Sequence, residues 1–174
     1  MKGSPENNSG LLFCYYTFTN METKIHKLKN FRLFLLDQIK NLNEVQLNKV
    51  PPGFNNNIIW NLGHMICVQQ NMSYVRARRP VIVDDKYFTP YLPHTRPESF
   101  VQEADIKMLS ELFISTIDAL QNDLDKNMFD HYTPSALIPE IYGFDVKNID
   151  SALEYLLHHD GYHAGYINSL MRFI

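Results

Sequence analysis

Two histidines near the C-terminal end of the sequence, His159 and His163, are four residues apart inside an apolar run that extends from Ser151 to Ile167. If this run is helical, the two imidazoles lie one turn apart on the same face and can reach a single divalent cation. Two ligands form only a weak site, and we expect His64, in a second apolar stretch, to supply the third. Three neutral nitrogen ligands leave at least one position for water or substrate, which is typical of a catalytic site for Zn²⁺, Ni²⁺, Fe²⁺ or Mn²⁺.

Simple packing is the alternative interpretation, because a histidine on an apolar helix face is often a hydrogen-bonded core residue. Burial of three unpaired imidazoles would cost roughly a few kcal/mol each, and a shared cation removes that cost. Asp160 follows the first histidine of the pair, as glutamate does in the HExxH helix of metalloproteases. Aspartate is shorter and the third ligand here lies upstream, so a carboxylate that is solvated or supports a ligand is favoured over a general base.

The other histidines have no partner at a ligand-like spacing. His158 is rotated by about 100° from its neighbour and is expected to face another helix or solvent. We expect the remaining three on the surface: His26, His94 and His131. Three glycines flank the predicted ligands, and a glycine inside a helix costs about 1 kcal/mol relative to alanine. This cost predicts a close approach of two helices at Gly63, Gly161 and Gly165, although simple packing explains the glycines equally well.

Apolar residues at three- and four-residue steps predict four helices. Proline, glycine and asparagine residues indicate where these helices begin and end. The predicted helices cover about residues 21–42, 58–79, 99–124 and 151–174, with Asn55, Asn56 or Asn57 capping the second, Ser99 opening the third and Asp150 capping the fourth.

Two long connections separate the predicted helices. Residues 80–98 read as an extended crossover in which a lid could reside, and residues 129–148 as an irregular segment. Because no strand-like alternation occurs, the pattern predicts an all-α fold, a four-helix bundle with long crossover connections. We expect a single domain over residues 21–174 and a peripheral N-terminal extension over residues 1–20.

The composition narrows the range of functions. The chain has 174 residues, 45% hydrophobic and 20% charged, with a net charge of −3. This charge disfavours nucleic-acid binding, and no apolar stretch is long enough to cross a membrane. Cys14 and Cys67 form neither a disulfide framework nor a CxxC pair, so we expect a reducing, cytoplasmic setting.

Two sequence blocks together resemble the DinB/YfiT-like superfamily: Asn56-Asn57-Ile-Ile-Trp60-Asn-Leu-Gly63-His64 and His159-Asp-Gly-Tyr-His163-Ala-Gly165-Tyr-Ile167. This superfamily is unrelated to the like-named translesion polymerase. The resemblance implies an up-down-down-up four-helix bundle, frequent homodimers, and a divalent ion, often nickel or zinc, held by His64, His159 and His163. Such proteins commonly have glutamate after the first histidine of the pair. Asp160 departs from this pattern, so the resemblance gives less support for assigning the role of that glutamate to Asp160.

Activities among proteins of this kind include thiol-dependent transfer, as in bacillithiol and mycothiol S-transferases and relatives of maleylpyruvate isomerase, and hydrolysis has been proposed for others. The resemblance therefore implies a metal-dependent transferase or hydrolase that acts on a small molecule, with a low-molecular-weight thiol as a further cofactor. In such an enzyme the metal lowers the pKa of a thiol or of water. Candidates to assist are Asp160, Tyr162, Tyr166, Asn57 and Tyr155. The alternatives are a non-catalytic, stress-related binding module with a structural metal and a helical scaffold with three ordinary core histidines.

Overall fold

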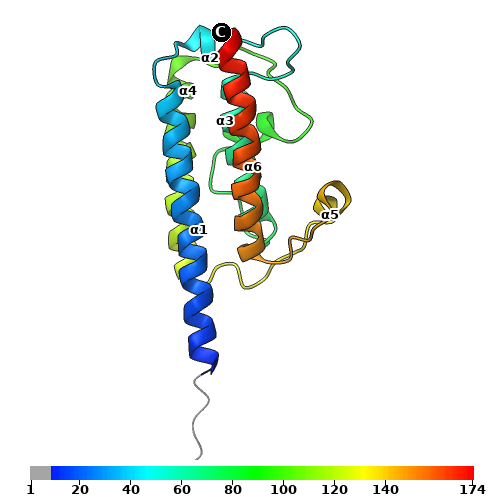
Figure 1. The fold of residues 1–174 in the computed structure, drawn as a ribbon. Coiled ribbons are helices and arrows are strands. Elements are labelled where there is room, and N and C mark those ends of the chain that lie inside the picture. Colours follow the sequence, from blue (N-terminus) through cyan, green and yellow to red (C-terminus); the bar gives the residue numbers. More distant parts are fainter. Residues whose placement is uncertain (1–8) are drawn as a thin grey trace, which may run out of the picture.

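The computed structural model describes the backbone from Ser9 to Ile174 and the side chains from Asn20 onward. Four long helices form a bundle in this part of the chain: α1 (Ser9–Ile39), α3 (Ile58–Gln70), α4 (Glu103–Asp125) and α6 (Ile149–Leu170). Figure 1 shows that α1 and α6 run in one direction, whereas α3 and α4 run in the other. The described residues contain no strand. The predicted all-α bundle, with its up-down-down-up order, is therefore confirmed.

The core lies between these four helices. α1 and α4 each bury one apolar stripe, which includes Leu28 and Leu35 on α1 and Phe113 and Ile117 on α4. α3 is different, because all 13 of its residues are buried. It packs against α4 and α6 and is also covered by the connection that precedes α4. A helix enclosed on every side holds its polar side chains in fixed positions, and His64 is one of them.

Short elements connect the long helices. They are α2 (Glu44–Asn48), a π-helical turn (Asn71–Val75), two 3₁₀ turns (Asp85–Tyr87 and Thr89–Tyr91), α5 (Leu137–Tyr142) and a C-terminal 3₁₀ turn (Met171–Phe173). The irregular segment predicted over residues 129–148 thus contains a short helix, which ends at Gly143 in a left-handed conformation with φ of 74°. Figure 1 shows α5 on an arm that stands beside the bundle.

Two helix starts differ from their predictions for reasons that involve distant residues. The third long helix begins at Glu103 and not at Ser99, because Asn48 of α2 holds both the amide and the carbonyl of Val101, at 2.8 and 2.9 Å. The fourth is capped by Asn148 and not by Asp150. Asp150 instead accepts a hydrogen bond from Lys24 of α1, at 2.7 Å.

The second and first helices also differ in length from their predictions. The α-helical part of the second ends at Gln70 and continues as the π-helical turn to Val75, short of Arg79. The first begins at Ser9, earlier than residue 21. The predicted extension therefore overlaps this helix, and its residues 1–8 lie outside the described part of the chain. Among the described helices, none has the length and apolar character needed to cross a membrane.

Candidate metal centre

The structure brings the three predicted histidines together at one place. His64 comes from α3, while His159 and His163 come from successive turns of α6. One nitrogen from each ring lies within 4.8 Å of the corresponding nitrogens of the other two. The three side chains are 7–8% exposed. Ligands at about 2.1 Å from a common ion are separated by roughly 3–4 Å, so small movements of the rings would bring the three nitrogens to the spacing that one ion requires.

A backbone carbonyl determines the tautomer of His64. Its Nδ1 lies 2.7 Å from the carbonyl oxygen of Tyr91. A carbonyl oxygen only accepts hydrogen bonds, so Nδ1 carries the proton and donates it. In the neutral ring the lone pair is therefore on Nε2, the nitrogen that remains for a metal.

Two asparagines orient His163 in the same way. The Nδ1 atom of His163 lies 2.7 Å from Oδ1 of Asn61. The amide nitrogen of Asn61 donates to the carbonyl of Asn57, also at 2.7 Å. This second bond determines which way the Asn61 amide faces, so its oxygen must accept from His163. The lone pair of His163 is again left on Nε2.

The third histidine has a carboxylate behind it. Nδ1 of His159 lies 3.8 Å from Oδ1 of Asp160, and neither atom has a hydrogen-bond partner among the described residues. A small rotation of the imidazole would form this bond and aim Nε2 at the other two rings. Asp160 is therefore placed next to His159 on the side away from the other two rings, where it could support a ligand as the sequence analysis expected.

Asp160 is placed wrongly for a general base that contacts substrate. Its side chain is fully buried, and its Oδ2 accepts a hydrogen bond from Nε of Arg32 at 2.8 Å. Arg32 is also fully buried and donates to the backbone carbonyls of Met65 and Phe113. Burial alone would raise the pKa of Asp160, but the Arg32 charge and the neighbouring His159 outweigh it and lower the pKa. The carboxylate is thus charged and faces the bundle interior.

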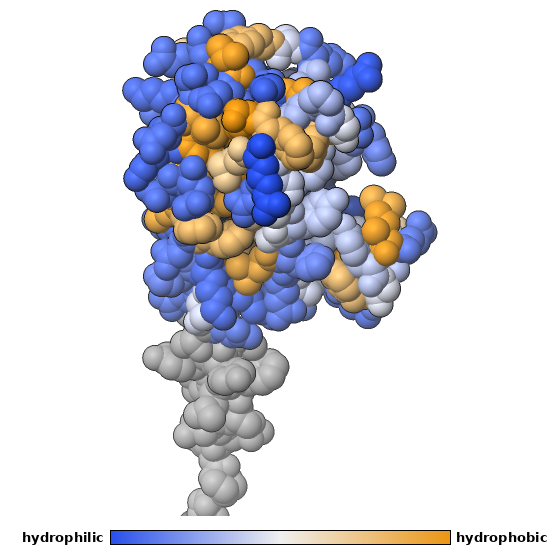
Figure 2. All heavy atoms as spheres, turned by 45° about the horizontal axis from the view of Figure 1, so that its top comes forward, coloured by the Kyte–Doolittle hydropathy of each residue, from blue (hydrophilic) through white to orange (hydrophobic). Residues whose placement is uncertain are grey.

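The open side of the histidine cluster is a cavity of about 330 Å³, called here the histidine cavity. Its walls are mainly apolar and aromatic, and they come from α3, α6, the arm that carries α5 and the connection before α4. The Trp60 ring stacks on His64, with centroids 4.7 Å apart and an interplanar angle of 11°. Exposed apolar side chains of α5 stand at the mouth, notably Leu137 and Ile141. Figure 2 shows this arm as an apolar surface patch.

Not all of the other predicted site residues line the histidine cavity. Tyr155, Tyr162 and Tyr166 all line the histidine cavity, and Tyr162 is 67% exposed. Asn57 does not line it: its side-chain oxygen caps α3 at Trp60 and its amide donates to the carbonyl of Asn48. Both polar atoms of the Asn57 side chain thus have protein partners, and its contact with substrate stays a prediction. His94, expected on the surface without a partner, is exposed but lies on the wall of the cavity.

The glycines are explained only in part. A Cβ atom at Gly63 would collide with the ring of Tyr91, so the close approach there involves the connection before α4 and not a second helix. At Gly161 and Gly165 a Cβ atom would meet nothing within 4 Å. The predicted helix contact at these two positions is wrong, because they lie on the exposed face of α6.

The match to a protein family includes the helices that carry the three histidines. The sequence model of the DinB superfamily matches residues 34–167, which include all three histidines. The chain belongs to the DinB superfamily. Among curated proteins, none matches the chain significantly. Within this DinB superfamily member, the three imidazoles, each with a protein group near Nδ1, could hold a divalent ion through three Nε2 atoms.

The buried histidines predict how the metal-free protein responds to acid. Burial lowers the pKa of His64 to about 4 and that of His163 to about 3, from an ordinary value of 6.5. Below pH 6.5 the unfolded chain binds protons that the folded protein excludes until about pH 4, so the free energy of unfolding falls with pH in this window. We expect a loss of roughly 2–4 kcal/mol between pH 7 and pH 5.

Urea unfolding in a chelator at several pH values measures this loss. Carboxylates also titrate in acid, so the control is the double variant His64→Gln/His163→Gln, which has no imidazole at either position. Its stability should fall much less between pH 7 and pH 5. Equal pH dependence in the two proteins would contradict the prediction.

Proposed function

We propose that this protein is a metal-dependent enzyme that transfers a small thiol onto an apolar electrophile. The observation that carries the proposal is the arrangement of His64, His159 and His163. Their Nδ1 atoms face protein groups, and their Nε2 atoms are left to hold zinc or nickel at the floor of the histidine cavity. Three ligands of this kind leave room for a further group from the cavity side.

Thiol transfer is favoured over hydrolysis by the charges around the cavity. A hydrolase of the HExxH type activates water with a carboxylate beside the metal. None of the described residues that line the histidine cavity carries a carboxylate, and Asp160 is held by Arg32 in the interior. A divalent ion in the site would supply the positive charge that ionises a thiol without a protein base.

The walls of the cavity indicate the electrophile. Leu137, Ile138 and Ile141 on the arm, together with the tyrosines of α6, offer an apolar and aromatic surface. Burial raises the pKa of Tyr155 to about 12, so its hydroxyl stays protonated and can donate to a leaving group. In the proposed reaction the thiol loses its proton to solvent, a sulfur–carbon bond forms, and the leaving group departs with the bonding electron pair.

A direct assay tests this proposal. Protein loaded with Zn²⁺ or Ni²⁺ is mixed with monochlorobimane, an apolar electrophile that fluoresces on conjugation, and with cysteine, glutathione, bacillithiol or mycothiol in turn. We expect conjugation above the uncatalysed rate with at least one thiol, and loss of this activity when the metal is chelated. The proposal would be contradicted if fully metal-loaded protein accelerated the conjugation of none of these thiols, or if it hydrolysed esters instead.

A further inference from the structure

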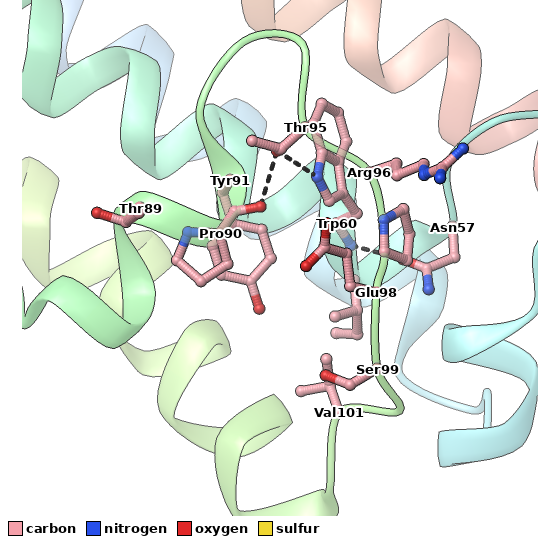
Figure 3. Close-up of a pocket in the computed structure, with 12 residues that line it drawn as sticks. Asn57, Trp60, Thr89, Pro90, Tyr91, Thr95, Arg96, Glu98, Ser99 and Val101 are labelled. Carbon is pink, nitrogen blue, oxygen red and sulfur yellow. Dashed lines mark hydrogen bonds between the residues drawn. The ribbon is translucent and has the colours of Figure 1, made fainter.

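A second cavity shares Trp60 with the histidine cavity and is not lined by any of the three histidines. Its volume is about 390 Å³, within the size range of small-molecule sites. It is enclosed by the first turn of α3 and by residues 89–101, called here the strap. The apolar part of its wall includes Ile59, Trp60, Pro90 and Val101. We call it the strap cavity, and Figure 3 shows its lining residues.

The strap is tied down at both ends, so the strap cavity is a built feature. The Trp60 indole donates to the hydroxyl of Thr95 at 3.1 Å, and that hydroxyl donates back to the carbonyl of Pro90 at 2.8 Å. At the far end, Asn48 holds the backbone of Val101 through two hydrogen bonds. These contacts position the walls before any ligand binds.

An unpartnered hydroxyl points into this space. Tyr91 is only 7% exposed, and its ring packs against the α3 backbone at Gly63. Figure 3 shows its hydroxyl directed toward the open centre of the strap cavity. Within the described chain, no hydrogen-bond partner satisfies this hydroxyl. Burial and the negative charge of Asp105 raise the pKa of Tyr91 to about 12, so the group is neutral and can accept a hydrogen bond from a ligand.

Charged groups on the strap favour a positive ligand. In Figure 3 the Glu98 side chain extends toward Trp60, whereas Arg96 extends away from the indole toward Asn57. Asp105, near Tyr91, is paired with Lys86 at 2.6 Å, so Glu98 is the acidic side chain that the cavity wall itself offers. A carboxylate that lines the same cavity as a tryptophan and a tyrosine ring attracts cations by its charge, and the negative faces of the two rings add to this attraction.

We propose that the strap cavity is a second ligand site, which binds a small organic cation consisting of an ammonium group on an apolar body. The ammonium group contacts Glu98 and donates to the Tyr91 hydroxyl. The apolar body lies against Trp60, Ile59 and Pro90. This site is separate from the metal-dependent reaction and does not require a bound metal.

Intrinsic fluorescence provides a direct test, because Trp60 is the only tryptophan of the chain. Metal-free protein at pH 7 is titrated with benzylammonium, with benzyl alcohol as the neutral probe and with benzoate as the anionic probe. We expect a saturable change with benzylammonium and at least about tenfold weaker binding of the other two. Equal affinity for the three probes, or no saturable change, would overturn the proposal.

Variants assign the response to one cavity, since Trp60 lines both. Glu98→Gln should weaken benzylammonium binding about tenfold, and Tyr91→Phe several-fold, with each protein still folded by circular dichroism. Arg96→Gln should leave the affinity unchanged or increase it. Tyr162 lines the histidine cavity and not the strap cavity, so Tyr162→Ala should leave the affinity for benzylammonium unchanged. Loss of binding in Tyr162→Ala, or undiminished binding in both Glu98→Gln and Tyr91→Phe, would refute the site.

Discussion

Replacement of Arg32 by methionine is expected to lower the free energy of unfolding by about 3–5 kcal/mol, the usual cost of leaving one partner of a buried ion pair uncompensated. Both side chains of the Arg32–Asp160 pair are fully buried. The guanidinium also stacks over Phe113, with its central carbon 4.6 Å from the ring centroid, and donates to two backbone carbonyls. The variant would leave the carboxylate of Asp160 without its charged partner in the core, and the two carbonyls would keep only their hydrogen bonds within α3 and α4.

Chemical denaturation of the metal-free proteins measures this effect. The double variant Arg32→Met/Asp160→Asn removes the stranded charge and should recover part of the lost stability. Lys29→Met is the matched control, because Lys29 lies on the same helix and pairs with Asp118 in a partly exposed position. Its change should stay within about 1 kcal/mol. A loss in Arg32→Met no greater than that in Lys29→Met would contradict the prediction.

His163→Ala is expected to weaken zinc or nickel binding by more than about a hundredfold, beyond what loss of a group behind a ligand costs. The reason is that two imidazoles remain where three meet. The fold should persist in the metal-free variant, because His163 borders an existing cavity. Metal titration measures the affinity, and thermal unfolding with and without metal measures the fold.

Two matched variants make this result specific. His158→Ala removes an exposed imidazole from the same helix and should leave metal affinity unchanged. Asn61→Leu removes only the partner of Nδ1 and should weaken binding by roughly 10–100-fold. If His163→Ala lost most of its stability while thiol conjugation was absent even in the parent protein, the non-catalytic module with a structural metal would be the better interpretation. Equal affinities in His158→Ala and His163→Ala would rule out the three-histidine site.

Local patterns in the sequence were sufficient for the helices and for the identity of the three histidines. The spacing of apolar residues depends on the 3.6-residue turn, so the helical class and the four long helices follow from it. The four-residue spacing of His159 and His163 likewise places them on one face of α6. The choice of His64 as their neighbour relied on its place in a buried helix, and the structure brings it to them.

The partners of the buried polar groups, in contrast, depend on the tertiary structure. Asp160 was expected either in solvent or in support of a ligand, and only the structure shows that Arg32, 128 positions away, holds it in the core. The sequence predicted Asp150 as the cap of the fourth helix, but Lys24 engages Asp150, and Asn148 caps α6. Asn48 prevents the third long helix from starting at Ser99 by holding Val101. Helical periodicity is a local property of the chain, whereas a buried charge or amide must find its partner wherever the packed bundle places one.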